Sequence, residues 1–403
     1  MEPLEALPPP LRYIEIPPGF SVTQLAASGP CLLRAVVPSS AVPRAPTSPQ
    51  AEFGKSVHTL MQLAATGRLG KRGVPLDVGE AFEHLLSESA SRLALDGDIR
   101  RYPDLRIAFT KREWEKRRHS AINRARELVS GQDTALRVDD GRSQEPLSLA
   151  RVLERNFRIA AEVPFESTRL RIRGRVDLVV LDSTGRVTIS DFKSGSVIDA
   201  RGEPNEQTVI QLRLYGLAVL DSASGSEVSL RVVSRDGETL VTFDAEAREA
   251  TTEWLRQRTE RLPEGRQLAA EELALPGLQC RRCPVRPVCP VYRNTVWELW
   301  KKPDAPFRLP LDTAGMVLSY EINGLGHGSV KMADLAGRVV KIHRLRPRSL
   351  FDSESGQMWF FDLASAEGKM QKTGWRHPRN FHEVAAVPTE NTAWTLQIFQ
   401  SPV

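Results

Sequence analysis

One stretch with period-two alternation of apolar and polar residues constrains the fold of this chain more than any other. It spans residues 172–195 and reads IRGRVDLVVLDSTGRVTISDFKSG. Such alternation predicts two β-strands, and the Ser-Thr-Gly run at residues 183–185 predicts a tight turn between them. The centre of the chain is therefore predicted to be a β-hairpin.

The predicted hairpin brings two carboxylates and a lysine together. With the turn centred on Thr184, Asp177 falls opposite Asp191, and side chains directly opposed on one face lie about 5 Å apart. Lys193 is two residues beyond Asp191 and therefore points to the same face. Carboxylates this close repel each other, and a divalent cation such as Mg²⁺ resolves the conflict. The residues alone also fit a surface hairpin with scattered charges.

The length and the charge of the chain limit its domain number and its partners. A chain of 403 residues is expected to form two or three domains. Its 55 Lys and Arg against 50 Asp and Glu permit an anionic partner without requiring one. The N-terminus lacks the apolar core of a signal peptide, and no run of about 18 apolar residues occurs. We therefore expect a cytoplasmic protein that does not bind membranes.

Shifts in composition predict four segments. Residues 1–20 are rich in proline and are expected to be a flexible N-terminal segment. Residues 21–300 are expected to form one α/β domain, with a helical insertion at about residues 67–145. Residues 301–312 contain three prolines and predict a linker. The strand-like runs in residues 313–403 predict a small, β-rich, OB-like barrel.

Two regions carry basic residues in patterns that suit nucleic acid. The insertion contains KREWEKRRHSAINRARELV, which is either a solvated helix face or a surface that follows phosphates. In residues 313–403, aromatic residues lie near basic residues in sequence, which suits single-stranded nucleic acid. Aromatic side chains of this kind usually belong to the core of a domain. The residues concerned are Trp359, Phe360, Phe361 and Trp375, with Lys341, Arg344, Arg346, Arg348, Arg376 and Arg379.

Three of the four cysteines lie close together in the sequence. Cys280, Cys283 and Cys289 fall within LQCRRCPVRPVC, whereas Cys31 stands alone. A secreted disulfide scaffold would be shorter and richer in cysteine, so the three thiols indicate a metal-ligand loop. Thiolates suit both zinc and iron–sulfur clusters, and their spacing does not distinguish the two. A redox function for the Cys-x-x-Cys pair is disfavoured because the βαβ setting of such chemistry is missing.

Four short motifs occur in an order that resembles one family. They are Gly54-x-x-x-His58, Gly174-x-x-Asp177, Asp191-x-Lys193 and Gln211-x-x-x-Tyr215. This order is similar to that of RecB-like members of the PD-(D/E)XK nuclease superfamily. The resemblance covers roughly residues 20–295 and implies a restriction-endonuclease-like α/β core.

The resemblance implies a catalytic role for several of these residues. Asp177, Asp191 and the Phe192 carbonyl would hold Mg²⁺ or Mn²⁺, and an imidazole ligand from His58 would favour Mn²⁺. Lys193 would hold the attacking water in line with the phosphorus. A divalent cation lowers the pKa of a water that it binds, which generates the nucleophile near neutral pH.

Three further residues would support this chemistry. Glu162, on the preceding predicted strand, would be an additional ligand or a base. Gln211 and Tyr215 would position Lys193 and the substrate backbone, or would simply pack a helix on the sheet. Phe192 stands where tyrosine is common in the family, and we expect this change to be harmless because its side chain points away from the carboxylates.

The cysteines extend the resemblance. Iron–sulfur members of the family, including CRISPR adaptation nucleases and the nuclease domains of some helicase–nucleases, place one cysteine before the nuclease core and three after it. The resemblance therefore implies a 4Fe–4S cluster on four thiolates, with Zn²⁺ as the alternative metal. The first thiol is followed by Leu32 where the family often has proline. The implied ligands are Cys31, Cys280, Cys283 and Cys289.

Together these features predict a metal-dependent DNA nuclease. The resemblance implies an exonuclease on single-stranded DNA or DNA ends, in DNA repair or in antiviral, CRISPR-type defence. No Walker A motif is present, so unwinding would require a helicase or a defence-system partner. The alternative is a catalytically silent DNA-binding or structural subunit of a helicase–nuclease or defence complex. The presence of Asp177, Asp191 and Lys193 disfavours this alternative.

Overall fold

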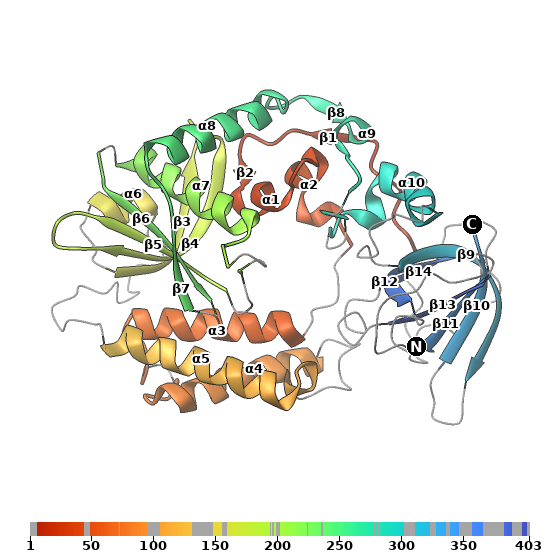
Figure 1. The fold of residues 1–403 in the computed structure, drawn as a ribbon, viewed down its shortest axis with the longest axis horizontal. Helices are drawn as coiled ribbons and strands as arrows, with labels where there is room; N and C mark the ends of the chain where they lie inside the picture. Colours follow the sequence, from red (N-terminus) through yellow and green to blue (C-terminus); the bar gives the residue numbers. More distant parts are fainter. Residues whose placement is uncertain are drawn as a thin grey trace. The chain divides into compact units, whose positions relative to one another are not determined.

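A computed structural model describes the chain as a mixed α/β protein with two compact units (Figure 1). The central unit comprises Glu15–Val36 and Pro49–Gln267. The terminal unit comprises Met1–Ile14, Val37–Ser48 and Leu268–Val403. The structure describes residues 6–43, 49–71, 73–95, 105–130, 148–154, 159–193, 195, 197–198, 202–223, 225–234, 237–277, 279–280, 283–301, 311–322, 328–335, 339–345, 357–365, 383–388 and 397–400.

The central unit is built on a six-stranded sheet. Its strand order is β2-β4-β5-β6-β7, and β3 pairs with β4. Strands β3, β4 and β5 are antiparallel to their neighbours in this group, whereas β5 and β6 are parallel. The strands are β2 (Phe20–Ser21), β3 (Ile159–Ser167), β4 (Ile172–Leu181), β5 (Val187–Phe192), β6 (Val228–Ser234) and β7 (Gly237–Val241).

The β4–β5 hairpin has the register that the sequence predicted. Leu181 pairs with Val187, and the pairing continues without a shift to Leu178 and Ser190. The turn is fixed by Asp182, whose Oδ1 accepts hydrogen bonds from the backbone N–H groups of Thr184 (2.8 Å) and Arg186 (3.0 Å). An Asp side chain that bonds the backbone ahead of it is a common way to close a turn. The predicted hairpin is therefore confirmed.

Helices cover the sheet of the central unit. Figure 1 shows α7 and α8 on one side of the sheet, and α3, α4 and α5 gathered on the other. The predicted insertion contains α4, a short 3₁₀ turn (Leu105–Ala108) and α5, and residues 131–145 of it lie outside the described residues. The helices are α1 (Val22–Ala27), α2 (Leu32–Val36), α3 (Pro49–Ala65), α4 (Val78–Leu95), α5 (Lys111–Ser130), α6 (Leu149–Glu154), α7 (Glu206–Ser222) and α8 (Ala245–Glu260).

Helix α7 places two polar side chains against the sheet. It begins after Asn205, whose Oδ1 accepts a hydrogen bond from the backbone N–H of Thr208 (3.0 Å) and so caps the helix. Its buried residues include Gln211 and Tyr215, which lie one helical turn apart on the same face. The helix contacts β3, β4, β5 and β6, so these two side chains face the strands and not the solvent.

The terminal unit contains a second six-stranded sheet. Its order is β13-β11-β10-β9-β12-β14, and β12 also pairs with β13, so that five of the strands form a closed series of neighbours. That this sheet forms a separate OB-like barrel over residues 313–403 stays a prediction. The elements are β1 (Tyr13–Glu15), β8 (Gln267–Ala269), α9 (Ala270–Leu273), α10 (Pro290–Lys301), β9 (Leu311–Ile322), β10 (Gly328–Asp334), β11 (Val339–Leu345), β12 (Gln357–Ser365), β13 (Glu383–Pro388) and β14 (Gln397–Gln400).

The end of the predicted linker belongs to a strand. Residues 302–310 lie outside the described residues, but β9 begins at Leu311. Asp312 is 1% exposed and accepts hydrogen bonds from Arg286 Nη1 (2.7 Å) and from the hydroxyl of Tyr292 (2.6 Å). The proline-rich context hid this strand, because nothing in the local pattern reveals that the aspartate has buried partners elsewhere in the sequence.

The structure bears on two further expectations. In the segment expected to be flexible, Leu7, Ile14 and Ile16 are buried, because apolar side chains there pack into the molecule. In the C-terminal region, Trp359 and Phe360 are also buried, so Phe360 is a core residue and not a stacking surface for bases. The side chains of Phe361, Trp375, Arg344, Arg346, Arg348, Arg376 and Arg379 lie outside the described residues. No described helix is long and apolar enough to cross a membrane.

We predict that Asp312→Ala destabilises the protein by about 3–5 kcal/mol, because it leaves a buried guanidinium without its carboxylate. The measurement is the free energy of unfolding in urea. The matched control is Glu238→Ala, which removes the partner of Arg231 from a half-exposed ion pair and should cost less than about 1 kcal/mol. Equal effects of the two substitutions would contradict the buried ion pair.

Candidate active site

Three carboxylates lie in one row across the sheet of the central unit. The register of the β4–β5 hairpin, continued by one residue, sets Asp177 opposite Asp191. On the other side of β4, the pair Ala161–Leu178 sets Glu162 opposite Asp177. Strands β3, β4 and β5 therefore each contribute one acid to the row. Side chains opposed in this way point to the same face of a sheet.

Glu162 has an unusual backbone conformation. Its φ is 53°, in the left-handed region that a residue with a side chain rarely adopts within a strand. Its carboxylate lies 3.5 Å from Arg175 Nη1, on a side chain that is largely exposed. Strained residues of this kind are concentrated at functional sites, where the surrounding structure maintains them.

Helix α3 adds a histidine to the row. His58 Nδ1 lies 3.5 Å from Asp177 Oδ2, and that oxygen also accepts a hydrogen bond from the backbone N–H of Phe192 (2.7 Å). One ligand atom from each of His58, Glu162 and Asp177 lies within 4.8 Å of the others. A neutral imidazole and two carboxylates are a donor set that suits Mn²⁺ or Mg²⁺.

The third carboxylate is held by a lysine and a glutamine. Asp191 is 2% exposed, and its oxygens lie 3.1 and 2.9 Å from Lys193 Nζ. Gln211 Nε2 donates to Asp191 Oδ1 (3.1 Å), and Gln211 Oε1 accepts from Lys193 Nζ (3.3 Å). Gln211 also donates to the hydroxyl of Tyr215 (3.0 Å). Asp191 Oδ2 is buried and forms the 2.9 Å ion pair with Lys193 Nζ, but no described group donates a hydrogen bond to it, so it keeps lone pairs that can bind a cation.

Burial sets the charge state of the site. Burial lowers the pKa of His58, so the imidazole is neutral and can act as a ligand at neutral pH. Burial and the neighbouring charge of Asp191 raise the pKa of Asp177 to about 8. A carboxyl group in this state is unfavourable as an anion unless a cation lies close to it. The residues present therefore fit a divalent metal ion.

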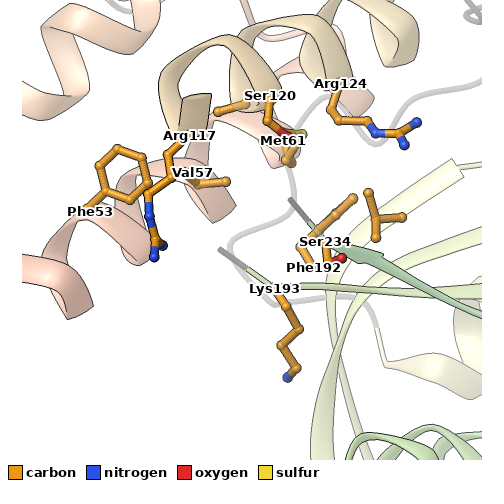
Figure 2. Close-up of a pocket in the computed structure, with 11 residues that line it drawn as sticks. Phe53, Val57, Met61, Arg117, Ser120, Arg124, Phe192, Lys193 and Ser234 are labelled. Carbon is orange, nitrogen blue, oxygen red and sulfur yellow. The ribbon is translucent and has the colours of Figure 1, made fainter. Parts of the chain in front are cut away.

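A small cavity of about 20 Å³ adjoins the site (Figure 2). Phe53, Val57 and Met61 line it from α3, and Arg117 and Arg124 line it from α5. Figure 2 shows the Lys193 side chain extending away from these two helices. The arginines were not identified as site residues from the sequence, because their position beside β5 depends on how α5 packs.

Three basic residues of α5 make contacts within the protein. Arg118 pairs with Glu83 (2.6 Å), Arg124 pairs with Glu127 (2.7 Å), and Arg117 lies over the ring of Phe109 (4.9 Å). Lys111, Arg112, Lys116 and Arg126 of the same helix are exposed, so whether α5 is a solvated helix face or a surface that follows phosphates stays a prediction.

The order of elements and the row of acids lead to one family. The family model of the PD-(D/E)XK nuclease superfamily matches residues 19–290, which is more than half of the chain. The chain belongs to the PD-(D/E)XK nuclease superfamily. Metal-dependent nuclease activity is the activity that this membership indicates.

Other comparisons add little to this assignment. No curated protein matches the chain. Among the solved structures that match is the crystal structure of SSO0001, with 22% sequence identity, coverage of 35% of this chain and 65% of that chain, and a TM-score of 0.22. The match thus spans less than two thirds of the length of that chain. This similarity is too low to assign any residue of the site.

The site of this PD-(D/E)XK chain gathers the side chains that the four motifs indicated. Asp177 and Asp191 come from β4 and β5, Lys193 directly follows β5, Gln211 and Tyr215 come from α7, and His58 comes from α3. Glu162, which lies outside the four motifs, comes from β3. The backbone N–H of Phe192 donates to Asp177, and its side chain lines the cavity, with its ring centroid 6.3 Å from that of His58. The sequence carries no signal for the strained backbone of Glu162 or for its contact with Arg175.

The four cysteines are buried and form no disulfide. Cys31 precedes α2 in the central unit, whereas Cys280, Cys283 and Cys289 lie in the terminal unit. The backbone N–H groups of Gly277 and Tyr292 lie 3.4 Å from the sulfurs of Cys280 and Cys289, respectively, and donate hydrogen bonds to them.

We predict that Asp177→Asn makes the metal-free protein more stable at alkaline pH. The pKa of Asp177 is raised from 3.8 to about 8 in the folded state, so the native protein binds more protons than the unfolded chain between these values. The free energy of unfolding should therefore fall as pH rises through this window. In the variant this fall should be smaller, with a gain of about 1–3 kcal/mol at pH 8.5 in EDTA.

The measurement is urea denaturation at pH 5 and at pH 8.5. The control variant is Glu264→Gln, which changes an exposed carboxylate outside the site and should leave the pH dependence as in the wild type. Identical pH dependence in the wild type and in Asp177→Asn would contradict the buried, protonated carboxyl group.

Proposed function

We propose that this chain is a RecB-like, metal-dependent deoxyribonuclease that hydrolyses phosphodiester bonds of single-stranded DNA or DNA ends. The observation that supports it most is the row of Glu162, Asp177 and Asp191 with His58 and Lys193 beside it. A catalytically silent protein has no need to keep these carboxylates close together against their repulsion.

In this proposal the ion is Mg²⁺ or Mn²⁺. Its ligands are Asp177, Asp191, the Phe192 carbonyl and His58, with Glu162 as a further ligand or as a base. The cation supplies Lewis acidity and lowers the pKa of a water at the site. The neutral state of the imidazole supports the assignment of His58, and the buried carboxylate of Asp191, beside Lys193, supports that of Asp191.

The protein's own groups then orient the reactants. Lys193 Nζ, held between Asp191 and Gln211, presents a fixed positive charge at the edge of the carboxylate row. We assign it to the attacking water and to the charge that develops on the phosphoryl oxygens. Gln211 and Tyr215 act on Lys193 and Asp191 through hydrogen bonds and are positioning residues.

We predict that Asp191→Ala and Lys193→Ala each reduce cleavage by at least about 100-fold, because they remove a ligand and a fixed positive charge. The measurement is cleavage of end-labelled single- and double-stranded DNA with Mn²⁺, Mg²⁺ or EDTA. The matched control is Lys71→Ala, which removes an exposed lysine and should cut as the wild type does. End labels also report polarity and distinguish exonuclease from endonuclease products.

The alternative function makes a different prediction in the same assay. A DNA-binding or structural subunit would bind DNA in EDTA but would leave it intact with either metal ion. If the wild type cuts DNA and both variants retain full activity, the result would contradict the assignment of the site.

We further propose that the four cysteines hold a 4Fe–4S cluster, with Zn²⁺ on the same thiolates as the alternative. Hydrogen bonds from backbone N–H groups to the sulfurs of Cys280 and Cys289 would stabilise negative charge on the ligands, as in cluster sites. Iron–sulfur nucleases of this type work in DNA repair or antiviral defence, with a helicase or defence-system partner.

We predict that anaerobically purified protein contains iron and inorganic sulfide and absorbs visible light. Cys283→Ser should lose the iron, the sulfide and the visible absorption. It should also unfold more readily, because metal binding contributes folding free energy. Ser28→Ala, at a buried hydroxyl near Cys31, serves as a control that keeps the iron. Stoichiometric zinc without iron in the wild type would contradict the cluster in favour of the zinc site.

A further inference from the structure

A groove of about 750 Å³ lies within the terminal unit. Its walls come from residues 10–13, the start of α9, the first turn of α10, the turn after β10 and strand β12. No residue of the carboxylate row lines it. Its volume falls in the range of ligand sites, about 300–1,000 Å³.

The groove has a positive wall. Arg12 and Arg293 line it, against the single carboxylate of Glu271 among the described lining residues. The guanidinium of Arg293 lies 5.0 Å from the centroid of the Trp359 ring, and its Nη1 donates to the carbonyl of Pro8 (3.0 Å). These contacts fix the position of the Arg293 guanidinium. Because this group is partly buried, binding of an anion beside it is favourable.

An exposed aromatic ring stands beside these cations. Tyr13 is 66% exposed because β1 alternates and turns Ile14 to the interior. The exposed side chain of Asn294, which can donate and accept hydrogen bonds, lies on the first turn of α10 in the same groove. A ring, an amide and two guanidinium groups together match the base, the base edge and the phosphates of a nucleotide.

We propose that this groove binds a short segment of single-stranded DNA. The ring of Tyr13 stacks on a base, and Arg12 and Arg293 contact phosphates. An acidic peptide would satisfy the arginines but would leave the ring and the amide without a matching group. The proposal rests on the proposed function for its choice of DNA as the anion, and it adds a binding site on the unit that lacks the carboxylate row.

The experiment measures binding of fluorescent oligo(dT) to the full chain by anisotropy in EDTA, where no cleavage occurs. Tyr13→Ala should raise Kd about tenfold, as expected for one lost stacking contact. Arg12→Ala should also reduce the slope of log K against log salt concentration by about 0.7, as expected for one lost phosphate contact on a single strand. Both side chains are exposed, so neither substitution should affect folding.

Matched controls are Tyr320→Ala and Lys331→Ala, which remove an exposed tyrosine and an exposed lysine outside the groove. They should bind oligo(dT) as the wild type does. Photocrosslinking of an oligonucleotide that contains 5-iodouracil should give an adduct on Tyr13. Unchanged binding by Tyr13→Ala and Arg12→Ala, or adducts confined to other residues, would overturn the proposal.

A competition experiment distinguishes a DNA strand from a free nucleotide and from an acidic peptide as the ligand of the groove. Oligo(dT) should displace the labelled strand, and neither dTMP nor an acidic peptide should do so at equal concentration. Displacement by the peptide or by dTMP alone would overturn the assignment to a DNA strand. Because the assay contains no metal ion, it is independent of whether the carboxylate row cuts DNA.

Discussion

Repulsion among buried carboxylates is the constraint on which the rest of this structure depends. Three strands that adjoin in the sheet each place one acid in the same row. Burial of Asp177, followed by the neighbouring charge of Asp191, raises the pKa of Asp177 to about 8. The protein offsets part of the cost with Lys193, Gln211 and the backbone N–H of Phe192. A divalent cation can remove the unfavourable free energy that these groups leave uncompensated. The close carboxylates therefore lower the stability of the metal-free protein and create its affinity for a metal ion.

The fold supplies this arrangement through a few specific elements. The turn closed by Asp182 sets the register of β4 and β5, and a slip of one residue would move Asp177 to the opposite face. Helix α7 presents Gln211 to Asp191 at the same point, and α3 brings His58 from the opposite layer. Each contribution comes from a different element, so the site exists only when the central unit is fully folded.

The sequence was sufficient for the parts of this account that depend on local pattern. The hairpin register follows from alternation and turn residues, and the four motifs point to the side chains that the site assembles. Features that depend on partners distant in sequence were missed. The Pro-rich context concealed the strand that carries Asp312, because its burial is explained only by Arg286 and Tyr292. The positive φ of Glu162 has no signal in the sequence, because glutamate is not a residue type that favours it. The burial of Phe360 shows why aromatic residues near basic ones are a weak indication of a binding surface.

The most direct test of the central claim is calorimetric titration of Mn²⁺ into metal-free protein at pH 7, repeated in two buffers with different heats of ionisation. We expect saturable binding that releases protons, because the carboxyl group of Asp177 is protonated at this pH and must ionise to act as a ligand. We also expect that His58→Ala weakens binding and that Asp177→Asn no longer releases the protons. Absence of saturable binding, or binding that neither substitution alters, would contradict a metal site at the row of carboxylates.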